Sequence, residues 1–217
     1  MLKEIFDNLT LHCGKFDTYF DVYERHFDKF VNKNPIVVEV GICRGGSAEM
    51  WKKYFGEGAT IIGIDIDPNA FKIEHQTPGC IQVYGNQADP EFWKKFFEDY
   101  PEVDIFIDDG GHHQSQQITT LYAAWPHIKN NGVFLCEDTH TSYWDSYGGG
   151  FCRESSFIEY CKRLTDTVNL DHFKDTQDQV NLFEHYTNLN SIHYYDSIVV
   201  LEKSTKVKST LLTSTPI

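Results

Sequence analysis

The chain has few basic residues and no long apolar run, and each shortage excludes a class of protein. Only 19 Lys and Arg stand against 32 Asp and Glu, which gives a formal net charge of −13. Surfaces that bind nucleic acid or anionic membranes need clustered basic residues, so we expect neither partner. No apolar run approaches the ~18–20 residues of a membrane-spanning helix.

The cysteines and the N-terminus together predict a cytoplasmic protein. The six cysteines are scattered and form no Cys-x-x-Cys motif, as expected for reduced thiols. The N-terminal residues lack the basic start and the apolar core of a signal peptide. With 217 residues, 41% of them hydrophobic, the chain is long enough for one domain with a large buried core.

Strand and helix patterns alternate along most of the chain. Strands are predicted at 36–40, 59–65, 80–84, 103–107, 132–136 and 197–201. Helices are predicted at 16–30, 47–55, 90–99, 115–129 and 154–168. This alternation is typical of parallel βαβ units, so we predict an α/β fold with a Rossmann-like, doubly wound, mostly parallel sheet.

We divide the chain into an N-terminal helical segment at 1–34, a Rossmann-like domain at 35–203 and a loose tail at 204–217. Apolar residues in the first segment recur every three or four positions between Phe16 and Phe30, which predicts a helix whose aromatic face joins the core. The tail contains seven Ser or Thr and no periodic pattern.

A glycine turn follows the first predicted strand, and an acid ends the second. The turn reads Gly-x-x-x-Gly-Gly from Gly41 to Gly46, which differs from the Gly-x-Gly-x-x-Gly of dinucleotide sites. Glycines let the backbone approach a ligand at the N-terminus of the next helix. Asp65 lies where an acid can accept both hydroxyls of a ribose. The alternative is a purely structural turn and an acid that only ends a strand.

The fourth and fifth strands both end in carboxylates. Asp109 follows the fourth strand, and Glu137 and Asp138 follow the fifth. Because hard carboxylates at neighbouring strand ends suit Mg²⁺ or Mn²⁺, we predict a metal site that these three residues form. The alternative is that they are solvated loop residues.

Histidines follow the same strand ends. His112 comes three residues after Asp109, close enough to accept a proton from a substrate hydroxyl as a general base. His113 and His140 leave a zinc-like site open as an alternative.

Together these motifs resemble class I S-adenosylmethionine-dependent methyltransferases, and within them the Mg²⁺-dependent sugar O-methyltransferases of macrolide tailoring. The resemblance covers about residues 12–203. The matching residues are Glu39-x-Gly41-x-x-x-Gly45-Gly46-Ser47, Asp65, Gly85-Asn86-Gln87-x-Asp89, Asp108-Asp109-Gly110-Gly111-His112, Glu137-Asp138-Thr139, Tyr143-Trp144, Gly148-Gly149-Gly150 and Tyr195-Asp196-Ser197-Ile198-Val199-Val200.

The resemblance implies a seven-stranded class I methyltransferase sheet that binds S-adenosylmethionine and Mg²⁺, with Mn²⁺ as the other candidate metal. The implied metal ligands are Asp109, Glu137 and Asp138, and the implied general base is His112. The implied cofactor-binding residues are Glu39, Gly41, Gly45, Ser47, Asp65, Gln87 and Asp108. In that assignment the glycine turn lines the methionine end of the cofactor, the acid after the second strand holds the ribose, and Gln87 or its neighbours contact the adenine.

The predicted function is S-adenosylmethionine- and Mg²⁺-dependent O-methylation of a sugar hydroxyl in a glycoside or glycan. The partner is then a small molecule or glycan with a free hydroxyl, and formation of a homo-oligomer stays open. Two alternatives remain: an NAD-dependent oxidoreductase and a non-catalytic S-adenosylmethionine-binding module. The missing Gly-x-Gly-x-x-Gly argues against the first, and the carboxylates with His112 argue against the second.

Overall fold

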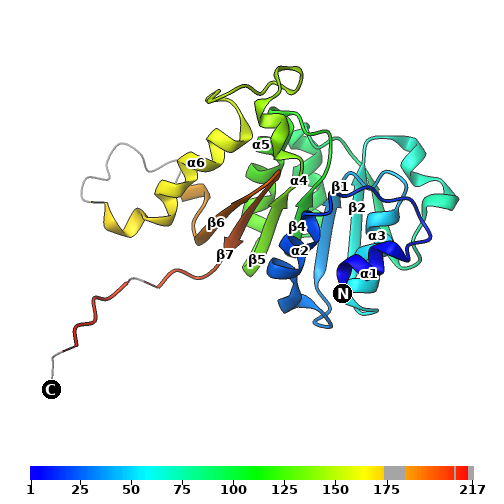
Figure 1. Ribbon diagram of the computed structural model, residues 1–217, viewed down its shortest axis with the longest axis horizontal. Helices are drawn as coiled ribbons and strands as arrows, with labels where there is room; N and C mark the ends of the chain where they lie inside the picture. The colour runs from blue at the N-terminus through cyan, green and yellow to red at the C-terminus, as the bar shows by residue number, and fades with distance from the viewer. Residues whose placement is uncertain (174–183, 208, 215–217) are drawn as a thin grey trace.

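The structure is a computed structural model that describes residues 1–173, 184–207 and 209–214. Its strands form one seven-stranded sheet in the order β3-β2-β1-β4-β5-β7-β6 (Figure 1). The first five strands of that order pair in parallel, whereas β7 runs antiparallel to both β5 and β6. The predicted doubly wound, mostly parallel α/β sheet is therefore confirmed.

The strands are β1 (Ile36–Val40), β2 (Thr60–Asp65), β3 (Cys80–Tyr84), β4 (Val103–Asp108), β5 (Ile128–Cys136), β6 (Leu189–Tyr195) and β7 (Ile198–Lys203). The α-helices are α1 (Leu2–Asp7), α2 (Tyr19–Phe27), α3 (Gly46–Phe55), α4 (Pro90–Asp99), α5 (Gln114–Ala124) and α6 (Phe157–Val168). Short 3₁₀ helices occupy Asp28–Phe30, Pro68–Phe71, Ile73–His75, Trp125–His127, Thr139–Tyr143, Asp145–Tyr147 and Leu170–His172.

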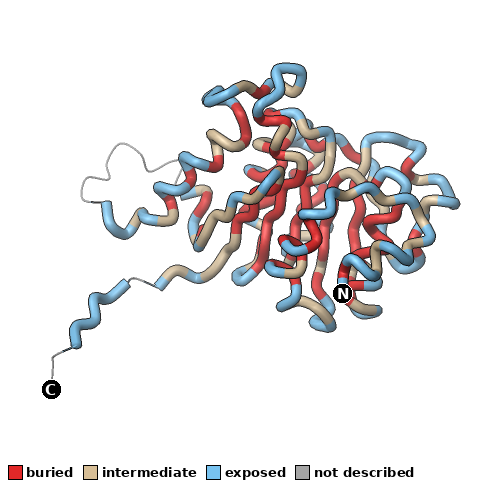
Figure 2. Tube along the Cα trace, in the orientation of Figure 1, coloured by how far each residue is buried: buried red, intermediate tan, exposed pale blue. Residues whose placement is uncertain are grey.

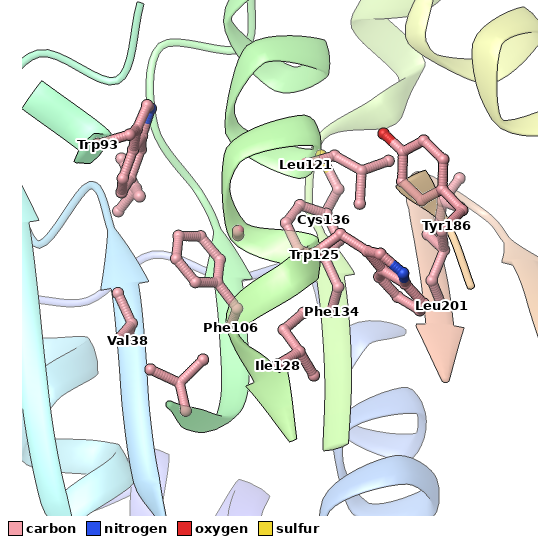
Figure 3. Packing of buried hydrophobic residues seen from close by; sticks show 14 of the residues in the cluster. Val38, Trp93, Phe106, Leu121, Trp125, Ile128, Phe134, Cys136, Tyr186 and Leu201 are labelled. Atoms are coloured by element: carbon pink, nitrogen blue, oxygen red, sulfur yellow. The ribbon is translucent and has the colours of Figure 1, made fainter. Parts of the chain in front are cut away.

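Each face of the sheet carries its own hydrophobic core. Helices α4, α5 and α6 cover one face, where Trp93, Phe106 and Phe134 are buried (Figure 3). Helices α1, α2 and α3 cover the other face, where Tyr23 and Trp51 are buried. The strands lie between these layers and are the most continuously buried part of the chain (Figure 2). Because both faces are covered, only the ends of the strands can present a site.

Several predicted elements occur at the expected residues. Strand β3 has the predicted bounds, and α4 begins with Pro90 after the N-cap residue Asp89, whose side chain accepts a hydrogen bond from the Glu91 amide. The helix predicted to reach residue 129 instead ends at Ala124, and a 3₁₀ turn that contains Pro126 leads into β5. Proline has no N–H to continue the α-helical hydrogen bonds, which explains the early end.

Two other segments differ from the prediction. Strand β6 is missing from the predicted strands, because it lies at the sheet edge and Leu189 is its one buried residue, so it has no apolar run. The helix predicted from residue 16 begins at Tyr19, and Phe16 lies outside it with 55% of its surface exposed. The buried aromatic face of that helix is otherwise present at Phe20, Tyr23 and Phe27.

The described residues after Lys203 form no helix or strand. Across the described ranges, every helix is too short or too polar to cross a lipid bilayer.

The sheet has its switch point between β1 and β4, which are neighbours in the sheet although they are far apart in the sequence. The chain leaves β1 toward α3 on one face and leaves β4 toward α5 on the other. In such sheets, ligands bind beyond the carboxyl ends of the strands at this point. The residues that the chain presents there include Gly41, Asp65, Asp109 and Glu137.

A polar cluster joins α2 to the antiparallel edge of the sheet. The Nδ1 atom of His26 lies 3.0 Å from Oε1 of Glu202, and Nζ of Lys29 lies 3.7 Å from the same oxygen. His193 Nε2 lies 3.7 Å from the other carboxylate oxygen. The hydrogen bond from His26, together with the charges of Lys29 and the histidines, lowers the pKa of Glu202 to about 2.

We expect Glu202→Gln to make the stability of the protein less dependent on pH. Because the folded-state pKa of Glu202 is lowered, its contribution is present above the unfolded-state pKa of about 4.3 and is lost as the pH falls toward 2. Allowing for solvent screening, the variant should lose about 1 kcal/mol of unfolding free energy at pH 7 and almost none near pH 2–3. Urea unfolding across this range checks the prediction, with Glu102→Gln at an exposed position as control. An equal loss at both pH values would contradict it.

Candidate active site

The turn after β1 requires glycine at two positions. Gly41 has a φ of +90°, and a side chain there would collide with the carbonyl oxygen of Asp109. Gly45 is the N-cap of α3 with a φ of +79°, and a side chain there would collide with the carbonyl oxygen of His75. The end of β1 therefore lies in direct backbone contact with the end of β4.

A buried carboxylate ties this turn to the helix that follows it. Oε2 of Glu39 accepts a hydrogen bond of 2.6 Å from the Ser47 hydroxyl, and Oε1 accepts one of 3.0 Å from the Trp51 indole. Burial raises the pKa of Glu39. Both Glu39 oxygens are thus used within the protein, and direct contact of Glu39 or Ser47 with a cofactor stays a prediction.

A cavity of about 460 Å³ opens beside the glycine turn. Asp65 lines the cavity, where its Oδ2 accepts from the Cys43 amide at 2.9 Å and its Oδ1 from the Asp67 amide at 2.8 Å. Each carboxylate oxygen keeps a further lone pair, so each can accept a hydrogen bond from a ligand hydroxyl. The volume is that of a small-molecule or cofactor site.

Gln87 braces the loop after β4. Its Nε2 donates to Oδ1 of Asp108 and to the Thr120 hydroxyl, both at 3.0 Å, and its Oε1 accepts from the Gly111 amide at 2.7 Å. Asp108 is buried, which raises its pKa, and its Oδ2 has no hydrogen-bond partner. The Gln87 amide is engaged within the protein at both its nitrogen and its oxygen, and its contact with adenine stays a prediction. The neighbouring Asn86 also lines the cavity.

A lysine that the sequence analysis does not single out lies among the predicted metal ligands. Nζ of Lys15 lies 2.6 Å from Oδ2 of Asp109, and it lies 2.8 and 2.9 Å from the two carboxylate oxygens of Glu137. It is also 3.8 Å from Oε1 of Glu39. The Lys15 side chain is only 1% exposed. A buried ammonium thus occupies the centre of three carboxylates.

The electrostatics of this cluster keep Lys15 charged. Burial by itself would lower the pKa of the Lys15 ammonium, but the negative charges of Asp109 and Glu137 outweigh burial and raise that pKa well above its usual value. Burial, followed by the negative charge of Asp109, raises the pKa of Glu137.

Asp138 faces the predicted base. Its Oδ1 accepts a hydrogen bond of 2.6 Å from the Tyr19 hydroxyl, and its Oδ2 lies 3.4 Å from Nε2 of His112. The backbone carbonyl of His112 accepts a hydrogen bond of 3.0 Å from the Thr141 hydroxyl, which fixes the loop in place. Nδ1 of His112 is buried without a hydrogen-bond partner.

The three predicted metal ligands are divided between two close groups that share Asp109. Asp109 and Glu137 are grouped with Glu39, and Asp109 and Asp138 are grouped with His112, the predicted base.

The zinc-like alternative gains no support from the two other histidines. His113 is the exposed N-cap residue of α5, with its ring against that of Tyr147. His140 Nδ1 lies 2.5 Å from the Ser197 hydroxyl and 4.0 Å from Asp138. Among the described residues, the close ligand groups at this edge of the sheet contain His112 but neither His113 nor His140.

Helix α2 supplies two hydroxyls that sequence reasoning treated as core. The Tyr23 hydroxyl donates to Oε1 of Glu137 at 2.7 Å, as Tyr19 does to Asp138. The signal was present: tyrosines four residues apart lie on one helix face, and a buried tyrosine hydroxyl needs a partner. Lys15 had no comparable signal, because it lies in an irregular segment between two helices.

Comparison with known proteins gives consistent relatives. Residues 38–139 match the methyltransferase domain family. The chain is 29% identical over 194 residues to 8-demethyl-8-alpha-L-rhamnosyl tetracenomycin-C 2'-O-methyltransferase of Streptomyces olivaceus, covering 86% of this chain and 50% of that protein. It is 30% identical over 194 residues to mycinamicin VI 2''-O-methyltransferase of Micromonospora griseorubida, covering 83% of this chain and 47% of that protein. The chain thus spans about half the length of these curated relatives.

A solved structure agrees with these relatives. MycE methyltransferase from the mycinamycin biosynthetic pathway, in complex with Mg and SAH, superposes with a TM-score of 0.81 and 26% identity over 94% of this chain and 54% of that one. The fold, the matched domain and the relatives agree: residues 38–139 form a methyltransferase domain, and the sheet has the fold of the class I S-adenosylmethionine-dependent methyltransferases.

Proposed function

We propose that the protein transfers a methyl group from S-adenosylmethionine to a hydroxyl of a sugar in a glycoside or glycan, with Mg²⁺ as the required metal. One observation carries this proposal: Asp109 lines both the cavity beside the glycine turn and a second pocket of about 270 Å³ that contains Glu137 and Asp138. A cofactor in the first space and an acceptor in the second would meet at Asp109.

The first cavity fits S-adenosylmethionine. Gly41 lines the cavity and lets the backbone turn at the end of β1, and Asp65 presents two acceptor oxygens for the ribose hydroxyls. The relatives are named as methyltransferases, and the MycE structure contains SAH. Asp65 and Gly41, which line this cavity, are the residues that we assign to direct contact with the cofactor, and Gly45 shapes the turn as the N-cap of α3.

The carboxylates fit a divalent cation. Asp109, Glu137 and Asp138 are hard oxygen donors at neighbouring strand ends, the type of ligand that Mg²⁺ prefers. The Lys15 ammonium between two of them shows that a positive charge is stable at this position. The MycE structure contains Mg. We therefore assign these three residues to the metal.

In the proposed mechanism, bound Mg²⁺ supplies positive charge that makes a sugar hydroxyl more acidic, and S-adenosylmethionine supplies the electrophilic methyl group. Nδ1 of His112 is buried, whereas Nε2 faces Asp138. We therefore assign Nε2 as the atom that accepts the hydroxyl proton. The Asp138 carboxylate then stabilises the imidazolium, and Tyr19 orients Asp138. The glycine turn and Asp65 orient the cofactor, so the reaction also gains from proximity.

Exposed aromatic rings favour a sugar as the acceptor. Phe16 lines the second pocket and is 55% exposed, and Trp144 nearby is 50% exposed, with its ring against His140. Aromatic rings at a pocket mouth suit the apolar face of a sugar ring. The relatives act, by their names, on rhamnosyl tetracenomycin and on mycinamicin VI. The proposed acceptor is therefore a small molecule or a glycan, and the proposed location of the reaction is the cytoplasm. The proposal includes neither nucleic acid nor a membrane as partner, and it makes no statement on a homo-oligomer.

Asp65→Ala should weaken binding of S-adenosylhomocysteine by about 1.5–3 kcal/mol, or roughly 10- to 150-fold, because one carboxylate accepts both ribose hydroxyls. In the wild type, the ligand should raise the melting temperature, since it binds only the native state. Thermal shift across a ligand titration measures both effects.

Asp67→Ala is the matched control, because Asp67 lines the same cavity but its carboxylate is engaged with Asn69. Its ligand-induced shift should remain close to that of the wild type. Stabilisation by NAD, with none by millimolar S-adenosylhomocysteine, would replace the proposal with an oxidoreductase.

A further inference from the structure

Lys15 lies on a short segment that crosses the carboxyl end of the sheet. We call residues 10–18, between α1 and α2, the N-terminal strap. At its start, the amides of Thr10 and Leu11 donate to the Glu49 carboxylate at 2.9–3.2 Å. At its end the chain enters α2, whose Tyr19 is bonded to Asp138. The strap is therefore anchored on both sides of Lys15.

Lys15 also separates the two spaces of the site. Gly14, Lys15 and Asp109 line both the cofactor cavity and the second pocket. The ammonium lies at the boundary, with Glu39, Asp109 and Glu137 grouped around it.

The Lys15 ammonium uses the oxygens that a metal would need. It contacts Oδ2 of Asp109 and both carboxylate oxygens of Glu137, and one of the latter also accepts from Tyr23. Glu137 is 1% exposed and therefore reaches solvent only through the space next to Lys15. A divalent cation bound to the same oxygens would lie a few ångströms from the ammonium, where two cations repel each other strongly.

We propose that Lys15 is a placeholder cation: its ammonium holds Asp109 and Glu137 together in the metal-free protein and leaves that position when a divalent metal binds. This inference rests on the proposed function, because it takes Asp109 and Glu137 as metal ligands. In this proposal the Lys15 ammonium competes with the metal for the same oxygens of Asp109 and Glu137. Binding of the metal and the position of the Lys15 side chain are therefore linked.

The surroundings allow Lys15 to leave without disruption of the core. Gly14 has open space around it, since a side chain built there would meet no atom within 4 Å. Phe16 on the other side is largely exposed. The open space beside Gly14 allows the strap to turn the Lys15 side chain outward, while the anchors at Glu49 and α2 remain in place.

The test is binding of Mn²⁺ alone, followed by calorimetry or electron paramagnetic resonance at one fixed pH, without cofactor or substrate. Lys15→Met keeps the length of the side chain and removes its charge, so Mn²⁺ should bind at least tenfold more tightly than to the wild type. Metal-free Lys15→Met should have a lower melting temperature, and Mn²⁺ should raise it by more than it raises that of the wild type.

Lys129→Met is the matched control, because Lys129 also pairs with a carboxylate, Asp104 near the start of β4, at 3.0 Å and away from the site. It removes the same charge and should leave Mn²⁺ affinity unchanged. Amine labelling of the wild type provides a second test that needs no variant: the Lys15 ammonium, with its side chain 1% exposed, should react slowly without metal and faster once Mn²⁺ is bound.

Equal or weaker Mn²⁺ binding by Lys15→Met would overturn the inference, because Lys15 would then act beside the metal and not in its place. Unchanged amine labelling of Lys15 in metal-loaded wild type would overturn it as well, even if the variant failed to fold. A different failure would be absence of Mn²⁺ binding in both wild type and variant, which would refute the metal site and with it the proposed function.

Discussion

Removal of divalent metal should abolish methyl transfer and leave cofactor binding almost intact. The carboxylates that we assign to the metal follow β4 and β5, whereas Asp65, which we assign to the ribose, ends β2. Treatment with EDTA should therefore reduce turnover by at least 10²-fold, because the charge that makes the hydroxyl acidic is worth several kcal/mol. Added Mg²⁺ or Mn²⁺ should restore the rate. Turnover with and without chelator, alongside S-adenosylhomocysteine binding under both conditions, checks the prediction.

Glu137→Gln should reproduce the effect of EDTA within the protein. The amide has the shape of the carboxylate but lacks its charge, so the metal loses a hard ligand while the bond from Tyr23 still has an acceptor. Asp145→Asn is the control, since Asp145 pairs with Arg153 on the surface. Full activity of chelator-treated enzyme, or of Glu137→Gln at low Mg²⁺, would contradict the prediction. Asp109, Glu137 and Asp138 would then have a structural role and no role as metal ligands in the reaction.

Much of the fold can be predicted from the sequence because its central strands are buried on both faces. Strands β1, β2 and β4 consist mainly of buried apolar residues, and the Asp89-Pro90 pair marks the start of α4 with a capping side chain. Where burial is incomplete the pattern is lost, as in β6 with its one buried residue, Leu189.

In the candidate site, too, the residues that follow buried strands could be predicted, and the residue in an irregular segment could not. Asp65, Asp109 and Glu137 could be found because parallel strands end at one edge, so their position follows from the strand pattern. Lys15 could not be found in this way, since it lies 94 residues from Asp109 and 122 from Glu137 in a segment without periodicity. Its role depends on how the strap folds back over the sheet, which no local pattern encodes.

His112→Ala should reduce kcat by about 10²–10⁴-fold, which is the usual contribution of a general base. The loss should fall mainly on kcat, because Nε2 of His112 faces Asp138, whereas Asp65 holds the ribose in our assignment. Since His112 also lines the cofactor cavity, S-adenosylhomocysteine affinity is measured on the same variant. Its melting temperature should also change little, since the ring makes no hydrogen bond whose loss would destabilise the loop. Steady-state kinetics and thermal unfolding of the same preparation measure these effects.

His113→Ala separates the chemistry from the loop structure. His113 is the next residue, but it is the exposed N-cap of α5, and its amide donates to Oε1 of Gln116 at 3.3 Å. His113→Ala keeps that amide and loses the ring contact with Tyr147, so it should change stability by less than about 1 kcal/mol and the rate by less than tenfold. Because only a neutral imidazole accepts a proton, the wild-type rate should rise with pH, and His112→Ala should lose this dependence. A loss below tenfold at His112 with an unchanged pH profile would mean that water takes the proton, so that Asp109, Glu137 and Asp138 would carry the reaction without a protein base.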